Sequence, residues 1–177
     1  MLDLSTAYHR YRFLGDEFLT WLWFSIENDP KLFSSADADC TALEIGNRMV
    51  LENRKTKSVE RITIRGDDAG LEEGRLALRK GALVSEMALV FKTGEYQWQF
   101  SIKGESLNIS SLKTPGPTLP QGPEQMEPFL LERYEFIKKI IVFIENLFKS
   151  FIRVRLSPQW ASKQVPSIRK WINSADV

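Results

Sequence analysis

The stretch LVSEMALVFKTGEYQWQFSIK, residues 83–103, decides the fold because it reads as two strands joined by a tight turn. In its second half, residues 95–103, apolar and polar residues alternate strictly, which is typical of a strand with one buried face. The apolar positions are Tyr96, Trp98, Phe100 and Ile102. Thr93 and Gly94 supply the turn. The hairpin therefore predicts an antiparallel sheet with these four side chains on its core face.

Further strands are predicted on both sides of this hairpin. Residues 42–53 and 58–65 precede it, and residues 106–112 follow it. Gly46-Asn47 is a candidate bulge in the first of these strands. A short amphipathic helix is predicted over residues 71–80, with Gly81 at its C′ position. Together the segments predict an α+β fold with an antiparallel sheet of about five strands.

Two helices are expected to pack against this sheet. Residues 16–27 are apolar almost all round, which is typical of a buried helix, and Asp16 is the predicted N-cap. A long helix is predicted over residues 129–152. It has a heptad seam three repeats long, formed by Leu130, Tyr134, Ile137, Ile141, Ile144, Phe148 and Phe151. Residues 31–40 read as a loop, and residues 163–173 as a short helix.

The length of 177 residues favours a single domain. Five prolines in residues 114–128 predict a loop before the long helix, and residues 153–177 form a basic C-terminal extension. The net charge of +1 excludes the overall basicity of a nucleic-acid coat protein, but not a basic patch. A single cysteine, Cys40, excludes an internal disulfide and fits a reducing compartment. The sequence shows neither an apolar leader nor a membrane span, so we expect a protein of the cytoplasm or the nucleoid.

Few residues are candidates for catalysis. His9 is the single histidine and lies in no recognisable motif, and neither a nucleophile elbow nor a phosphate-binding glycine loop is present. We therefore expect no enzymatic activity and no cofactor. One alternative stays open, a metal-dependent nuclease whose carboxylates come from two acidic pairs. These pairs are Asp37 with Asp39, and Asp67 with Asp68.

The distribution of charge is more informative than the total. Residues 1–47 have a net charge of −5, residues 48–137 of 0, and residues 138–177 of +6. A second basic cluster contains Arg54, Lys55, Lys57, Arg61 and Arg65. Cations of this kind bind phosphates without reading bases. The predicted DNA-binding residues are Arg61, Arg65, Arg79, Lys80, Lys138 and Lys139.

Several strings resemble the C-terminal part of the RdgC family, recombination-associated DNA-binding proteins of bacteria. They are EFLTWLW (17–23), ALEIGNRMVL (42–51), LEEGRLALRKGALVSEMALVF (71–91) and YQWQFSIKGESLNISSLK (96–113), followed by the late helix from Phe129. The resemblance covers about three quarters of the chain. It implies binding to double-stranded DNA without strong sequence preference, a ring-like dimer and restraint of a strand-exchange recombinase. It supplies no catalytic residues.

The leading hypothesis is therefore a non-enzymatic, sequence-non-specific DNA-binding protein that acts in recombination or replication as an oligomer, here a homodimer. An interaction or assembly module without a nucleic-acid role is the alternative. Clustering of the six predicted cations on one concave face favours DNA binding, whereas scattered cations with an exposed apolar patch favour assembly.

Overall fold

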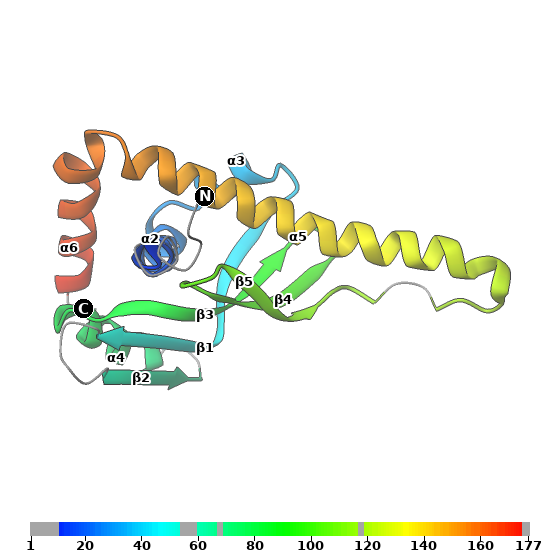
Figure 1. The fold of residues 1–177 in the computed structure, drawn as a ribbon, viewed down its shortest axis with the longest axis horizontal. Helices are drawn as coiled ribbons and strands as arrows, with labels where there is room; N and C mark the ends of the chain where they lie inside the picture. Colours follow the sequence, from blue (N-terminus) through cyan, green and yellow to red (C-terminus); the bar gives the residue numbers. More distant parts are fainter. Residues whose placement is uncertain (1–10, 54–59, 67–68, 117–118, 175–177) are drawn as a thin grey trace, which may run out of the picture.

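The computed structural model describes residues 11–53, 60–66, 69–116 and 119–174, and five strands in these parts form one antiparallel sheet (Figure 1). The strand order is β2-β1-β3-β4-β5. The strands are β1 (Ala42–Asn53), β2 (Glu60–Arg65), β3 (Leu83–Lys92), β4 (Gln97–Lys103) and β5 (Asn108–Lys113). The helices are α2 (Phe13–Asn28), α3 (Lys31–Ala36), α4 (Ala69–Arg79), α5 (Met126–Arg155) and α6 (Val165–Asn173). The predicted α+β fold is confirmed.

The central hairpin has the register that its alternation predicts. Trp98 lies opposite Phe91, and Ile102 lies opposite Met87, with all four side chains buried. Phe100 is buried as well, so three of the four predicted core positions are correct. Tyr96 is the exception, because it precedes β4 and is 43% exposed. It lies in the turn, where the strand's alternation no longer applies.

Strand β1 is irregular at the predicted bulge. Ile45 pairs with Leu89 and Met49 pairs with Met87. Three residues of β1 therefore lie between the two pairs, but only one residue of β3 does. Gly46 lies in the irregular segment, where an added Cβ would come within 3.0 Å of the Ala88 side chain. Because the difference is two residues, the alternation continues beyond it. Met49 and Leu51 therefore point into the core, as Leu43 does, and Arg48 points to the other side of the sheet.

Helix α2 packs closely on the covered face of the sheet. Its Thr20 hydroxyl accepts a hydrogen bond from the backbone N–H of Val84 at 3.1 Å and donates one to the Asp16 carbonyl at 2.8 Å. Phe18 contacts Phe151 of α5, with ring centroids 5.6 Å apart. Helix α2 thus joins the sheet to the long helix.

Helix α5 runs over the covered face with only its C-terminal half and projects past the sheet with its N-terminal half (Figure 1). The buried residues are Ile140, Phe143, Ile144, Leu147 and Phe151. Of the predicted heptad seam, Ile144 and Phe151 are buried, whereas Leu130, Tyr134 and Ile141 are exposed. The seam is therefore divided between the core and the surface. No described helix is long and apolar enough to cross a membrane.

Several predicted boundaries were wrong. Helix α2 begins at Phe13, so Asp16 is not its N-cap but a buried residue beside Gly104. Residues 31–36 form helix α3 where a loop was predicted. Strand β5 begins at Asn108 rather than at residue 106, because Leu107 has a positive φ of 53°. The last helix is preceded by a π-helical turn, Trp160–Gln164.

We expect Gly15→Ala to destabilise the fold, since α2 passes directly over the turn between β4 and β5. A Cβ on Gly15 would lie 1.6 Å from the backbone oxygen of Gly104, so one backbone must move. Forced shifts of this kind cost about 1–3 kcal/mol. Urea unfolding monitored by circular dichroism measures the loss. The control is Gly94→Ala, where an added Cβ meets nothing within 4 Å; equal stability of the two variants would contradict the close approach.

Candidate nucleic-acid interface

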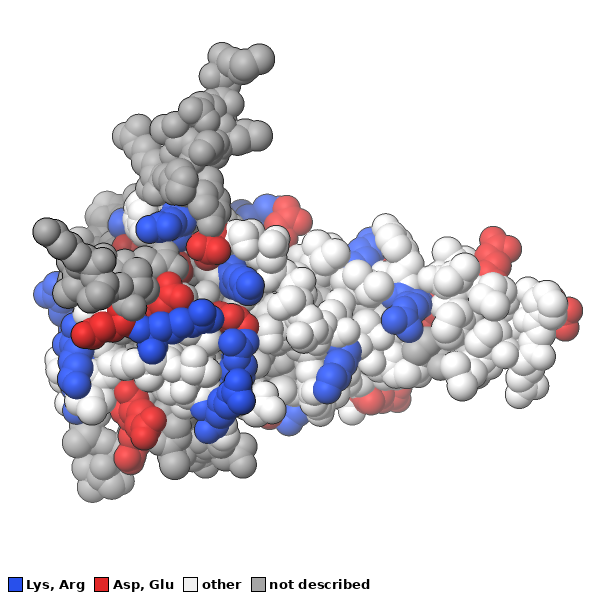
Figure 2. Space-filling model, turned by 60° about the horizontal axis from the view of Figure 1, so that its bottom comes forward, with Lys and Arg blue, Asp and Glu red and all other residues white. Residues whose placement is uncertain are grey.

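The candidate interface is the face of the sheet that the described helices leave open. Helices α2, α4 and α5 contribute buried residues to the core on the other face, and Ile64 of β2 is buried there with them. The open face carries the alternate strand positions, which are mostly polar. Figure 2 brings this side forward and shows Lys and Arg gathered over the sheet, with Asp and Glu among them.

Three arginines gather on strands β1 and β2 at one end of this face. Arg48 and Arg65 are directly opposite each other in the register of β1 and β2. Arg61 is four residues before Arg65 on the same strand and therefore points to the same side. Like charges placed opposite each other in a sheet repel. Glu86 of β3 relieves part of the repulsion through its ion pair with Arg48, and it lies 3.9 Å from Arg61.

Strands β4 and β5 add two lysines on the same face. Lys103 is opposite Glu86 of β3, and Lys113 is opposite Gln99. Within the described residues, neither lysine forms an ion pair within 4.0 Å, and the same holds for Arg65. These cations are therefore available to an external anion.

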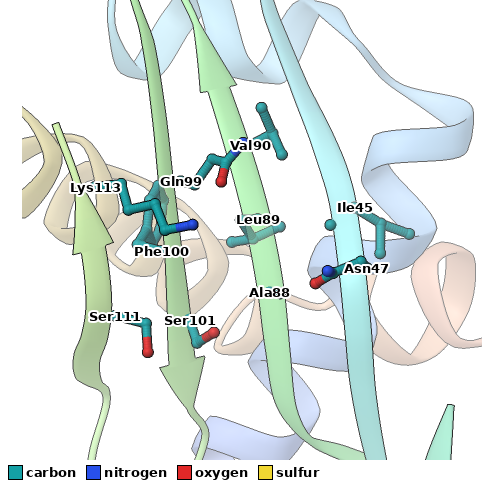
Figure 3. A pocket seen from close by; sticks show the side chains of 11 residues that line it. Ile45, Asn47, Ala88, Leu89, Val90, Gln99, Phe100, Ser101, Ser111 and Lys113 are labelled. Carbon is teal, nitrogen blue, oxygen red and sulfur yellow. The ribbon is translucent and has the colours of Figure 1, made fainter. Parts of the chain in front are cut away.

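A shallow hollow of about 360 Å³ lies between strands β1 and β5 on the open face (Figure 3). Its floor includes the small residues Gly46, Ala88 and Ser101, and Lys113 and Gln99 stand at its side. The helices lie behind the strands in this view, so the hollow opens away from them. A second hollow of about 150 Å³ is lined by two cations, Arg61 and Lys103, and by three acidic residues, Glu52, Glu86 and Glu105. The face is thus hollowed and charged along its length.

The open-face strand positions have a net charge of +3. Six are basic (Arg48, Arg61, Arg65, Lys92, Lys103 and Lys113) and three are acidic (Glu44, Glu52 and Glu86). Lys92 is bound to Glu44 at 2.7 Å, so it contributes little to the field. None of the described strand positions on this face is aromatic. The surface can therefore hold phosphates, but it offers no platform for stacking bases.

Only two of the six predicted DNA-binding residues, Arg61 and Arg65, lie on the open face. Arg79 instead closes the C-terminal end of α6, donating hydrogen bonds to the carbonyls of Ile172 at 2.7 Å and Ser174 at 3.3 Å. Lys80 is exposed at the end of α4, a helix that packs on the covered face. The six cations are therefore scattered over several elements and do not cluster on one concave face, which favours the assembly alternative for these residues.

The two lysines of α5 are engaged with carboxylates. Lys138 forms an ion pair with Glu135 at 3.2 Å, and Lys139 binds both Asp37 and Asp39 at 2.9 Å. Burial lowers the pKa of Lys139, but the hydrogen bonds to Asp39 and Asp37 outweigh it, so this pKa lies above the usual lysine value. Lys139 is thus a charged group whose charge is already matched by two carboxylates.

The same contacts bear on the nuclease alternative. Asp37 and Asp39 hold an ammonium group, which occupies the place that a metal ion would need. Asp67 and Asp68 lie outside the described residues, as does His9. In the described part of the chain, no three His, Cys, Asp or Glu side chains are grouped so that they could hold a metal ion. The acidic pair near α5 is therefore an ion-pair site.

Cys40 is buried next to this pair. Burial and, to a smaller extent, the charge of Asp37 raise the pKa of its thiol to about 11. The thiol is therefore protonated at neutral pH and is a poor nucleophile.

Four cations of the open face, Arg48, Lys92, Lys103 and Lys113, were missed by the sequence-based prediction. For Arg48 and Lys103 a signal was available, because each neighbours apolar residues of an alternating strand. Lys113 gave no such signal, since the irregularity between Ser110 and Lys113 decides to which side it points. Arg54, Lys55 and Lys57 of the predicted basic cluster lie outside the described residues.

Comparison with known proteins found no matching family model, no matching curated protein and no matching solved structure.

Proposed function

We propose that this protein binds the phosphate backbone of double-stranded DNA through the open face of its sheet, without reading base sequence. The observation that carries the proposal is the arginine group on β1 and β2. Arg48 and Arg65 are held opposite each other, and Arg61 lies on the same face four residues earlier in β2. Facing like charges cost stability in the free protein. A bound phosphate would relieve this repulsion.

The dimensions of the face suit a duplex. Strands β2 and β5 are separated by three other strands, so Arg65 and Lys113 are about four strand spacings apart, or ~19 Å. This span exceeds the ~12 Å width of the major groove of B-DNA. Cations at the two edges of the sheet can therefore contact phosphates on both sides of a groove.

The side chains favour non-specific binding to the backbone. Sequence readout in the major groove commonly uses a helix or β-ribbon that presents side chains to base edges. The open face instead is a broad sheet surface in which the principal cations are Arg and Lys, and its described strand positions have no aromatic side chain to stack on an unpaired base. A role in recombination, with a strand-exchange recombinase as partner, rests on the resemblance to the RdgC family.

The test is the dependence of binding on salt. If one chain engages ~3–4 phosphates, log K against log[salt] should have a slope near −3, and affinity should fall ~60-fold between 50 and 200 mM salt. Fluorescence anisotropy with two duplexes of unrelated sequence measures both slope and specificity. We expect the same curve for the two duplexes. Salt-independent binding, or discrimination between the duplexes, would reveal base contacts and contradict the proposal.

A second candidate function is protein assembly without a nucleic-acid role. It is favoured by the scattered cations and by the projecting half of α5, whose large apolar side chains are exposed. If the protein does not bind duplex DNA at low salt, the assembly function is supported instead.

A further inference from the structure

The projecting half of α5 exposes more large apolar side chains than any other described element. Leu130, Leu131 and Tyr134 are 56–58% exposed, and Ile141 is 51% exposed. Met126 and Val142 are nearly half exposed. Single exposed apolar residues are ordinary on protein surfaces, but a group of six within residues 126–142 of one helix marks an interaction site.

These residues form a continuous stripe. Leu130, Tyr134, Ile137 and Ile141 follow each other at spacings of 4, 3 and 4 residues, which keeps them on one side of a helix. Leu131 and Val142 widen the stripe. We call Leu130, Leu131, Tyr134, Ile137, Ile141 and Val142 the α5 stripe. The same spacing continues into the buried part of the helix at Ile144. The seam is therefore buried in the core at its C-terminal end and exposed at its N-terminal end.

The charges around the stripe identify the kind of partner. Residues 126–142 contain three acidic and three basic side chains, so their net charge is zero. The acidic residues are Glu127, Glu132 and Glu135, and the basic ones are Arg133, Lys138 and Lys139. Two of the three cations are already paired within the chain. A neutral surface does not attract a strongly charged partner, and it does not repel a copy of itself.

The geometry of the stripe also fits a second copy. Apolar residues alternating at 4 and 3 positions are the pattern with which two helices pack side by side. In a two-fold symmetric dimer the same patch is used by both chains and must be complementary to itself. A straight, neutral, apolar helix surface meets this condition.

The area is of the size that a dimer requires. Five of the six side chains of the stripe are about half exposed, and together they offer on the order of 400 Å² of apolar surface per copy. A standard interface takes ~800 Å² from each partner, of which about two thirds is apolar in homodimers. The stripe therefore supplies most of the apolar part of such an interface.

We propose that two copies of this chain associate through the α5 stripe, helix against helix, about a two-fold axis. The contact is independent of the open sheet face and would stand even if that face bound no DNA. Where both proposals hold, a dimer carries two open faces and the salt slope of duplex binding is about twice that of one chain.

Sedimentation velocity at micromolar concentration tests the proposal. The wild-type protein should sediment as a dimer of about twice 20.4 kDa. The double substitution Leu130→Glu, Ile141→Glu places charges in the stripe and should leave a monomer. Leu156→Glu is the matched control, because Leu156 is 80% exposed at the end of α5 outside the stripe, and this variant should remain a dimer.

Two results would overturn the proposal. One is a wild-type protein that sediments as a monomer, which would leave the stripe to a different partner. The other is a dimer that persists in the Leu130→Glu, Ile141→Glu variant with its circular dichroism spectrum unchanged. If that double variant does not fold, Tyr134→Glu alone replaces it, since this residue makes few contacts with the core. Duplex binding by a monomeric stripe variant, with half the wild-type salt slope, would separate the two proposals.

Discussion

Trp98→Asp should leave the chain unfolded at room temperature. Trp98 is 1% exposed, its indole N–H donates to the Phe136 carbonyl at 3.1 Å, and its ring packs on Phe91 and Phe136. Truncation of a buried Trp costs about 3–5 kcal/mol, and an unpaired buried carboxylate adds several more. The sum is comparable to the whole stability of a typical domain, about 5–15 kcal/mol. Thermal and urea unfolding by circular dichroism measure the effect.

The control for this substitution is Gln97→Asp. Gln97 precedes Trp98 in β4, so it lies on the opposite side of the sheet and is exposed. The same new charge should there cost about 1 kcal/mol or less, mainly through the low strand preference of Asp. A Trp98→Asp variant that melts like the wild type would show that the covered and open faces of β4 are assigned the wrong way round.

Charge reversal on the open face should remove most of the duplex binding. In the variant Arg61→Glu, Arg65→Glu, two attractive contacts with phosphate become repulsive. At 0.1 M salt each neutralised phosphate is worth roughly a factor of eight, so we expect a loss of about 100-fold or more. The loss should be equal for unrelated duplexes. Fluorescence anisotropy measures the affinities.

The matched control reverses two lysines elsewhere. Lys149 of α5 and Lys170 of α6 are exposed and lie outside the open face, and Lys149→Glu, Lys170→Glu changes the net charge by the same amount. Its affinity should fall only several-fold. Both variants should melt close to the wild-type temperature, because exposed charges contribute little to stability. Equal losses in the two variants would show that binding follows total charge rather than the open face.

Local periodicity was sufficient to predict most elements. Strict alternation over residues 95–103 predicted β4 and its buried face, and the left-handed Gly81, with a φ of 92°, ends α4 as predicted. The sequence-based predictions were wrong where a contact between segments distant in the chain determined the structure instead of the local residue pattern. Asp16 has the residue type of an N-cap, but it lies inside α2 and against Gly104, 88 positions away.

The candidate site was predicted less well for the same reason. In the sequence, Arg79 has the features of a free surface cation. In the structure it binds backbone carbonyls at the end of α6, which lie more than 90 residues later in the chain. Lys139 is neutralised by Asp37 and Asp39, which precede it by about 100 residues. A sequence shows that a cation is present, but not which carboxylate or carbonyl the fold brings to it.

The strands, the two packing helices and the heptad spacing of α5 follow from the sequence alone, because each depends on how side chains repeat within one segment. Which face of the sheet is covered, and where α5 leaves it, depends on how the whole chain packs. Burial is a property of the whole fold, since a side chain is covered only when segments far apart in the chain pack over it. The open face and the α5 stripe are two surfaces that the described helices do not cover.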